Sequence, residues 1–306
     1  MRLVLLLCLG TCALASDALV FSFFRNNGED GLYLATSSDG LSWKALNGDK
    51  PLLRPAVGES KLMRDPSIVR GPDGTFHMVW TTAWQGKTIG YASSKDLRNW
   101  SPQRAIEVFA GTDVDMKDIH NCWAPELYYD AKSKQFSIIW ATTIRGRYNE
   151  TLGQAGRDNN HRIYEVRTRD FQTFTKPKVY YDPGFIVIDA AIFPLAGKYA
   201  MVVKDETQSP KPAKYLFLTT ADSLDGPWSQ PSAKITGDYW AEGPAPLRIG
   251  NSWYIYFDKY RDHKYGAVKS SDGKSWEDVS DAVSFPKGTR HGTAFRAPRK
   301  VVDALR

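Results

Sequence analysis

The chain repeats one short pattern five times, and this repeat limits the folds open to it more than any other feature. Each copy has an alternating apolar run, a small polar corner with an Asp, and an aromatic residue that would begin the next strand. The copies are LYLATSSDGLSW ending at Trp43, IGYASSKDLRNW at Trp100, IYEVRTRDFQTF at Phe174, LFLTTADSLDGPW at Trp228 and YGAVKSSDGKSW at Trp276. Such self-similarity indicates a repeat architecture.

Apolar runs before each copy complete a repeating unit of four strands. A second run precedes every copy, and a lead strand precedes four of these pairs, while the fifth lead strand, residues 290–295, stands near the C-terminus. We therefore predict an all-β, single-domain, five-bladed β-propeller whose C-terminal strand joins the N-terminal blade. A β-sandwich has similar strand spacing but no reason to repeat S-x-D-x-x-x-W. No helical periodicity is seen after residue 16.

The first 15 residues, MRLVLLLCLGTCALA, have one Arg, an apolar centre and an A-x-A site, which is typical of a signal peptide. The run is too short for a membrane anchor of about 20 residues, and a lipoprotein anchored at Cys12 would lack small residues before that Cys. We expect residues 16–306 to be a secreted domain without a transmembrane segment. Only Cys122 would then remain, as a buried small residue without a disulfide partner rather than a nucleophile.

Charge excludes one class of partner. The formal net charge of +6 comes from 40 basic and 34 acidic residues, and these are dispersed rather than gathered in a basic stripe. Nucleic-acid binding requires such a stripe. We expect no nucleic-acid partner and a monomeric protein.

Three acidic residues stand at the start of predicted lead strands, in Arg64-Asp65-Pro66, Ile188-Asp189-Ala190 and Glu242-Gly243-Pro244. Each alone is ordinary turn chemistry. Three at equivalent places indicate one site, because the innermost strands of a propeller line its central channel. His291 begins the fifth lead strand and should join them. Aromatic rings at Trp80, Trp84, Trp123 and Trp240 would wall the channel, as expected for a carbohydrate site.

Glycoside hydrolysis requires one protonated acid and one ionised carboxylate. Glu242 is the candidate general acid, because partial burial and negative neighbours would favour its protonated form. Asp65 is the candidate general base, with Arg64 pointing the opposite way along the strand. Asp189 supplies a third charge that tunes Glu242 and orients the substrate, unless it is only a structural turn residue.

These stretches, with Trp123-Ala124-Pro125-Glu126 and Arg290-His291-Gly292-Thr293, resemble glycoside hydrolase family 43. The resemblance implies an Asp base, an Asp pKa modulator and a Glu acid in this chain order, and an inverting reaction without a covalent intermediate. It also implies that His291 faces a calcium ion held through water, or else is a hydrogen-bonded channel residue. No other cofactor is expected. Glu126 departs from the Asp of many relatives.

The resemblance points to arabinose-, xylose- or galactose-containing polysaccharides. We expect an exo-acting α-L-arabinofuranosidase, with β-xylosidase or exo-galactanase as alternatives and a non-catalytic carbohydrate-binding propeller as the rival from another class. A sucrose- or fructan-cleaving propeller would begin with Trp-x-Asn-Asp-Pro-Asn, which is absent. The polar loop 144–161 would close one end of the site. Candidate substrate contacts are Trp84, Trp123, Glu126, Trp240 and Arg296, followed by His120 and His161.

Overall fold

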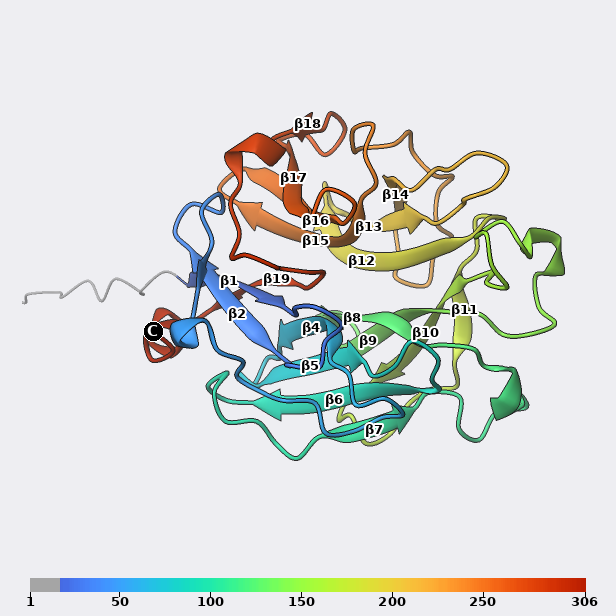
Figure 1. Cartoon of the computed structure of the whole chain (residues 1–306), viewed down its shortest axis with the longest axis horizontal. Coiled ribbons are helices and arrows are strands. Elements are labelled where there is room, and N and C mark those ends of the chain that lie inside the picture. The colour runs from blue at the N-terminus through green and yellow to red at the C-terminus, as the bar shows by residue number, and fades with distance from the viewer. Residues whose placement is uncertain (1–16) are drawn as a thin grey trace, which may run out of the picture.

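The computed structural model describes residues 17–306. Five antiparallel sheets stand in a ring around one axis (Figure 1), which confirms the predicted five-bladed β-propeller. The predicted signal peptide, residues 1–15, lies outside the described residues and stays a prediction. Within residues 17–306, no helix has the length and hydrophobicity needed to cross a membrane.

Each blade is a meander that starts at the axis and runs outward. Blade 1 contains β19 (Ala294–Ala297), β1 (Ala18–Phe23), β2 (Tyr33–Ser37) and β3 (Lys44–Ala45). Blade 2 contains β4 (Arg64–Arg70), β5 (Phe76–Thr81), β6 (Thr88–Ser94) and β7 (Arg104–Glu107). Blade 3 contains β8 (Trp123–Asp130), β9 (Gln135–Thr142), β10 (Arg162–Thr168) and β11 (Lys178–Tyr181). Blade 4 contains β12 (Val187–Leu195), β13 (Lys198–Asp205) and β14 (Leu216–Ala221). Blade 5 contains β15 (Glu242–Ile249), β16 (Ser252–Lys259), β17 (Lys264–Ser270) and β18 (Glu277–Asp278).

The ring closes as predicted, because a C-terminal strand completes the N-terminal blade, but this strand begins at Ala294, so His291 lies in the segment before it and not at its start. β19 pairs antiparallel with β1, with Ala18 opposite Ala297 and Phe21 opposite Ala294. The short helix α1 (Arg299–Asp303) follows β19, although no helix was expected there. Four 3-10 turns, η1 (Asn47–Asp49), η2 (Met116–Asp118), η3 (Asn149–Thr151) and η4 (Ser280–Ala282), lie in loops.

Blade 4 has three regular strands, so the expectation of four strands in every unit is wrong there. The segment after β14 still donates backbone N–H groups, from Ser229, Ser232 and Ile235 to carbonyls of β14. Pro227 and Pro231 interrupt this segment, and proline has no N–H to continue a ladder. An irregular edge therefore takes the place of the fourth strand.

The repeated S-x-D-x-x-x-W sequence is a turn held by side chains. In the first copy, Asp39 Oδ1 accepts the backbone N–H groups of Leu41 at 2.8 Å and Ser42 at 2.9 Å, while Trp43 Nε1 donates to the Gly40 carbonyl at 3.1 Å. Carboxylates of Asp96, Asp170 and Asp272 accept equivalent pairs of backbone N–H groups. The turn fixes the path from the third strand into the fourth.

The hydrophobic core is divided among the five interfaces between neighbouring blades. The aromatic residue of each copy packs at the interface with the preceding blade; the five are Trp43, Trp100, Phe174, Trp228 and Trp276. Trp80 is fully buried in one of these interfaces and does not wall the channel, which corrects the prediction. Cys122 is also buried, and burial raises the pKa of its thiol to about 12, as expected of an unreactive cysteine.

The turn carboxylates predict a dependence of stability on acid. Burial alone would raise the pKa of Asp96, but the hydrogen bonds from Asn99, Arg98 and Ser94 together outweigh it and lower the pKa to about 2. Because this value is below the unfolded value of about 3.9, Asp96 stabilises the fold above pH 4, and this contribution is lost as the pH falls toward 2. Asp96→Asn keeps an acceptor oxygen but cannot titrate. We expect its unfolding free energy, measured in urea, to fall less steeply between pH 4 and 2.

The control is Asp113→Asn, since the exposed Asp113 carboxylate accepts no hydrogen bond from residues 17–306. Equal acid slopes for Asp96→Asn and the unmodified protein would contradict the prediction.

Candidate active site

Four of the inner strands begin with the same irregularity. Their pairing with the second strand of the blade shifts register between Arg64 and Ser67, Trp123 and Glu126, Ile188 and Ala191, and Glu242 and Ala245. Inside each shift one residue has a positive φ: Asp65 at 52°, Ala124 at 46°, Asp189 at 50° and Gly243 at 63°. These are β-bulges, which turn side chains away from strict alternation.

The bulges correct two predictions from the sequence. Asp65 and Asp189 occupy equivalent left-handed positions, but Glu242 precedes its left-handed residue and corresponds to Arg64. The three acids are therefore not at equivalent places. Arg64 lines the same cavity as Asp65 rather than pointing away, because the left-handed Asp65 breaks the alternation of the strand.

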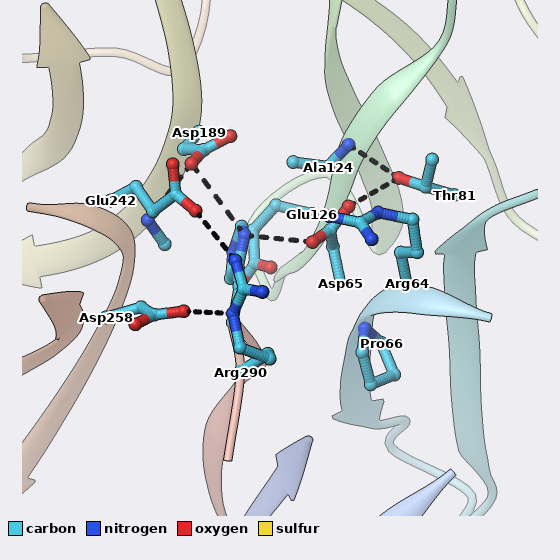
Figure 2. Close-up of polar contacts among 12 residues, drawn as sticks. Arg64, Asp65, Pro66, Thr81, Ala124, Glu126, Asp189, Glu242, Asp258 and Arg290 are labelled. Atoms are coloured by element: carbon cyan, nitrogen blue, oxygen red, sulfur yellow. Dashed lines mark hydrogen bonds and ion pairs between the residues drawn. The ribbon is translucent and has the colours of Figure 1, made fainter. Parts of the chain in front are cut away.

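The three acids nevertheless face one cavity of about 510 Å³ at the axis. Figure 2 shows Asp65, Asp189 and Glu242 pointing toward one another from different blades. His291, Trp84, Trp123 and Trp240 line the cavity as predicted. The remaining lining residues are Arg64, Thr81, Ala155, Arg157, Ile188, Lys204, Glu206, Gln208, Lys214, Tyr260, Arg261 and Arg290.

Four candidate contacts lie outside this lining. Glu126 stands past the bulge of β8 and accepts a hydrogen bond from Thr293 at 3.1 Å, and burial raises the pKa of its carboxyl to about 7. Arg296 is exposed and donates to the Arg248 carbonyl at 2.8 Å. His161 is buried behind Trp123, with ring centroids 4.9 Å apart. His120 is half-buried and does not reach the cavity.

Asp65 is held in its ionised form. Thr81 Oγ1 donates to Asp65 Oδ2 at 2.8 Å and itself accepts the N–H of Ala124, the left-handed residue of the next blade (Figure 2). His291 Nδ1 lies 3.3 Å from Asp65 Oδ1. Burial alone would raise the pKa of Asp65, but the hydrogen bond and charge of His291, with Arg64 and Thr81, lower it to about 2.

At Asp189, in contrast to Asp65, the effect of burial on the pKa outweighs that of the neighbouring cations. Its Oδ2 accepts the N–H of Gly243 at 3.0 Å, so it contacts the backbone directly after Glu242. Burial raises the pKa of Asp189 to about 6; the nearby His291 opposes this shift, and the negative charge of Glu242 reinforces it. Two carboxylates this close disfavour two negative charges. Asp189 therefore binds a proton more easily than Asp65 does.

Glu242 is surrounded by cations as well as acids. Lys204 Nζ donates to Glu242 Oε2 at 2.9 Å, and Arg290 Nη2 lies 3.5 Å from Glu242 Oε1. Arg290 also donates to the buried Asp258, as Figure 2 shows. The surroundings of Glu242 are thus mixed in charge, rather than uniformly negative as the sequence suggested.

With this geometry in place, comparison with known proteins decides the family. The model of the family described as "Probable glycosyl hydrolase domain", related to glycosyl hydrolase family 43, matches residues 15–301. The chain belongs to this family. The resemblance inferred from the sequence is thereby confirmed.

This family-43-related chain has a curated relative of named activity. An α-L-arabinofuranosidase of Bifidobacterium longum subsp. longum is 22% identical over 225 residues, which cover 68% of this chain and 21% of that protein. The chain thus matches about a fifth of the length of this curated relative.

Solved structures share the fold at low identity. An α-L-arabinofuranosidase from Lactobacillus brevis has a TM-score of 0.55 at 19% identity, covering 71% of this chain and 72% of that one. An exo-β-1,3-galactanase from Phanerochaete chrysosporium has a TM-score of 0.59 at 14% identity, covering 90% and 66%. A xylan β-1,4-xylosidase from Bacillus halodurans has a TM-score of 0.53 at 19% identity, covering 73% and 42%.

The sequence analysis missed several polar cavity residues at the ends of the second strands or just after them. Lys204 lies at the end of β13 with Glu206 just beyond it, and Tyr260 and Arg261 follow β16. The second strand of a blade runs antiparallel to the first, so its end lies beside the start of the inner strand. The sequence signal that could have indicated these residues is the group of charged residues directly after each of the apolar runs 201–203 and 254–257.

The family-43 resemblance implied a calcium ion near His291. Among residues 17–306, no three His, Cys, Asp or Glu side chains are grouped to hold a metal ion. Burial would lower the pKa of His291, but Asp189 and Asp65 raise it to about 9, and a protonated imidazole is not a metal ligand. The side chains therefore do not fit direct coordination. A calcium ion held through water stays a prediction, and no step below uses it.

The buried Lys204 gives a test of this charge arrangement. Its Nζ contacts Glu206 Oε2 at 2.8 Å and Glu242 Oε2 at 2.9 Å, and the residue is 1% exposed. Lys204→Met should reduce the unfolding free energy by about 3 kcal/mol, because it leaves both carboxylates in the cavity without their shared cation. Lys204→Arg keeps the charge and should lose less. Denaturant unfolding measures both.

Lys198→Met is the matched control on the same strand. Lys198 forms an exposed ion pair with Asp222, and such pairs contribute at most about 1 kcal/mol. An equal loss from Lys198→Met and Lys204→Met would show that the buried charge arrangement is not stabilising.

Proposed function

We propose that this chain is an inverting glycoside hydrolase that removes sugar side chains from polysaccharides. The observation that carries the proposal is the meeting of Asp65, Asp189 and Glu242 in one cavity of a family-43-related propeller. Its wall includes the flat indole faces of Trp84, Trp123 and Trp240, of which Trp84 and Trp240 each have one guanidinium over the ring, from Arg64 at 4.1 Å and Arg261 at 3.9 Å. Paired carboxylates beside such faces are suited to cleavage of a glycosidic bond.

Asp65 is the general base of the proposed reaction. It is ionised because its pKa is about 2, and Thr81 and His291 fix both of its oxygens. It takes a proton from a water molecule whose oxygen bonds to the anomeric carbon. The bond from that carbon to the leaving oxygen breaks in the same step, which inverts the configuration.

Glu242 is the general acid that gives its proton to the leaving oxygen. Asp189 acts through Glu242 rather than on the substrate oxygen. Asp189 accepts the N–H of Gly243, the residue after Glu242, and the negative charges of Asp189 and Glu242 repel each other. In the free protein, the carboxylate of Glu242 contacts the cations Lys204 and Arg290. In the proposed complex, the substrate oxygen replaces one of these contacts.

We propose α-L-arabinofuranoside as the first substrate, with exo action. This choice is supported by the similarity to the Bifidobacterium α-L-arabinofuranosidase. β-Xylosidase and exo-galactanase activities remain the alternatives, because solved structures of both kinds share the fold. Ala155 and Arg157 of the loop 144–161 line the cavity. A loop that lines the cavity in this way supports a pocket rather than an open groove.

The second candidate is a non-catalytic carbohydrate-binding propeller. The two cations on Glu242 favour this alternative, because a binding protein has no need of a protonated acid. Failure to release sugar from any aryl arabinofuranoside, xyloside or galactoside, together with retained glycan binding, would support it.

The assigned roles predict a large loss of rate in two variants. Asp65→Asn and Glu242→Gln should each lower kcat by at least about 10²-fold, the lower end of general acid–base contributions. Hydrolysis of the aryl glycosides measures this loss, and NMR of the first product anomer reports inversion. Glu277→Gln, on the exposed edge strand β18, is the control and should retain full rate. Near-normal rates in either active-site variant, or a retained configuration, would refute the assigned mechanism.

A further inference from the structure

The cavity wall beyond Glu242 carries a ladder of charged side chains, of alternating sign, that ends at Trp240. Glu242 contacts Lys204, Lys204 also contacts Glu206, and Lys214 Nζ lies 2.8 Å from the other oxygen of Glu206. Lys214 in turn faces the ring of Trp240, with its Nζ 5.7 Å from the ring centroid. The ladder therefore begins at the proposed general acid and ends at an aromatic wall.

Two arginines add positive charge at the outer end of this ladder. The guanidinium of Arg261 lies 3.9 Å from the ring centroid of Trp240. Arg157 belongs to the loop 144–161 and lies near Lys214: burial lowers the pKa of Lys214, Glu206 opposes this, and the charge of Arg157 lowers it further. Both arginines are exposed and line the cavity. Within residues 17–306, neither forms an ion pair with a carboxylate.

This side of the cavity is therefore positively charged. Its cations are Arg157, Lys204, Lys214 and Arg261, and its carboxylates are Glu206, Glu242 and the neighbouring Asp189. Arg290 does not alter the balance, because it is paired with Asp258. A guanidinium stacked on an indole is already oriented, and its planar fork of donors matches a carboxylate or a sulfate. A negatively charged ligand could therefore supply the counter-charge that Arg157 and Arg261 lack within residues 17–306.

We propose that the sugar on the leaving-group side of the scissile bond is acidic, with a carboxylate or sulfate bound by Arg157 and Arg261. This inference rests on the proposed function, because it uses Glu242 as the group that contacts the leaving oxygen. Side chains beyond Glu242 then contact the leaving group, whereas the released sugar lies on the Asp65 side. The substrate class is a neutral side-chain sugar attached to an acidic glycan.

The first experiment uses two aryl glycosides that differ only in charge. The leaving groups are 4-hydroxyphenylacetate and its methyl ester, on whichever of arabinofuranose, xylose or galactose is hydrolysed. The methylene group separates the carboxylate from the phenolic oxygen, so the two leaving groups are electronically similar. We expect kcat/KM for the acid to exceed that for the ester roughly tenfold, the effect of one charge-assisted hydrogen bond. Added NaCl should reduce this preference.

Variants locate the preference. The double variant Arg157→Gln/Arg261→Gln should hydrolyse the two glycosides equally, and Arg261→Lys should keep part of the preference. Arg145→Gln is the control, because Arg145 is an exposed arginine of the same loop that does not line the cavity. It should leave the preference unchanged. Equal kcat/KM values in the unmodified protein, or a preference that survives the double variant, would overturn the proposal.

A binding experiment separates this inference from the proposed hydrolase activity and distinguishes the two anions. Calorimetry at constant ionic strength compares galactose, galacturonate and galactose 6-sulfate, none of which has a bond to cleave. Tighter binding of either acidic sugar, lost in the double variant, supports the inference even if no aryl glycoside is hydrolysed. Hydrolysis without any preference for acidic ligands would overturn the inference and leave the hydrolase proposal standing.

Discussion

The site depends on one backbone constraint, the left-handed residue in the bulge at the start of the inner strands. A bulge leaves a backbone N–H without a ladder partner, and a buried N–H of this kind must find another acceptor. At Ala124 the acceptor is Thr81, and at Gly243 it is Asp189. Each bond crosses from one blade to the next. The same irregularity that turns carboxylates toward the axis thus also ties neighbouring blades together around them.

The neighbouring charged side chains give two chemically identical carboxyl groups, Asp65 and Asp189, different pKa values. Asp65 lies next to His291, Arg64 and Thr81 and stays ionised, whereas Asp189 lies next to Glu242 and has a raised pKa. The two residues have the same left-handed backbone conformation. Their difference therefore comes from the side chains around them, which belong to several blades. This separation of two carboxylates by environment is what acid–base chemistry at a single site requires.

Local and long-range features differed in how well the sequence predicted them. The repeat was readable because Asp39 and Asp96 act on N–H groups two and three residues away, so the whole turn is visible in a short window. The offset of Glu242 was not readable, since the bulge position depends on pairing between strands. Lys204 was missed for a related reason: its importance comes from Glu242, which lies 38 positions further along the chain. Trp80 was misplaced because an apolar run does not reveal which face of a blade it covers.

The strand that closes the ring is also the last part of the site to be synthesised. Arg290 and His291 directly precede β19, and both hold carboxylates donated by earlier blades. On the ribosome, a chain that already contains Asp65, Asp189 and Asp258 lacks these counter-ions until the final segment emerges. The segment from Arg290 to Ala297 supplies these counter-ions and also completes the first blade, so the candidate site and the closed ring depend on the same stretch of chain.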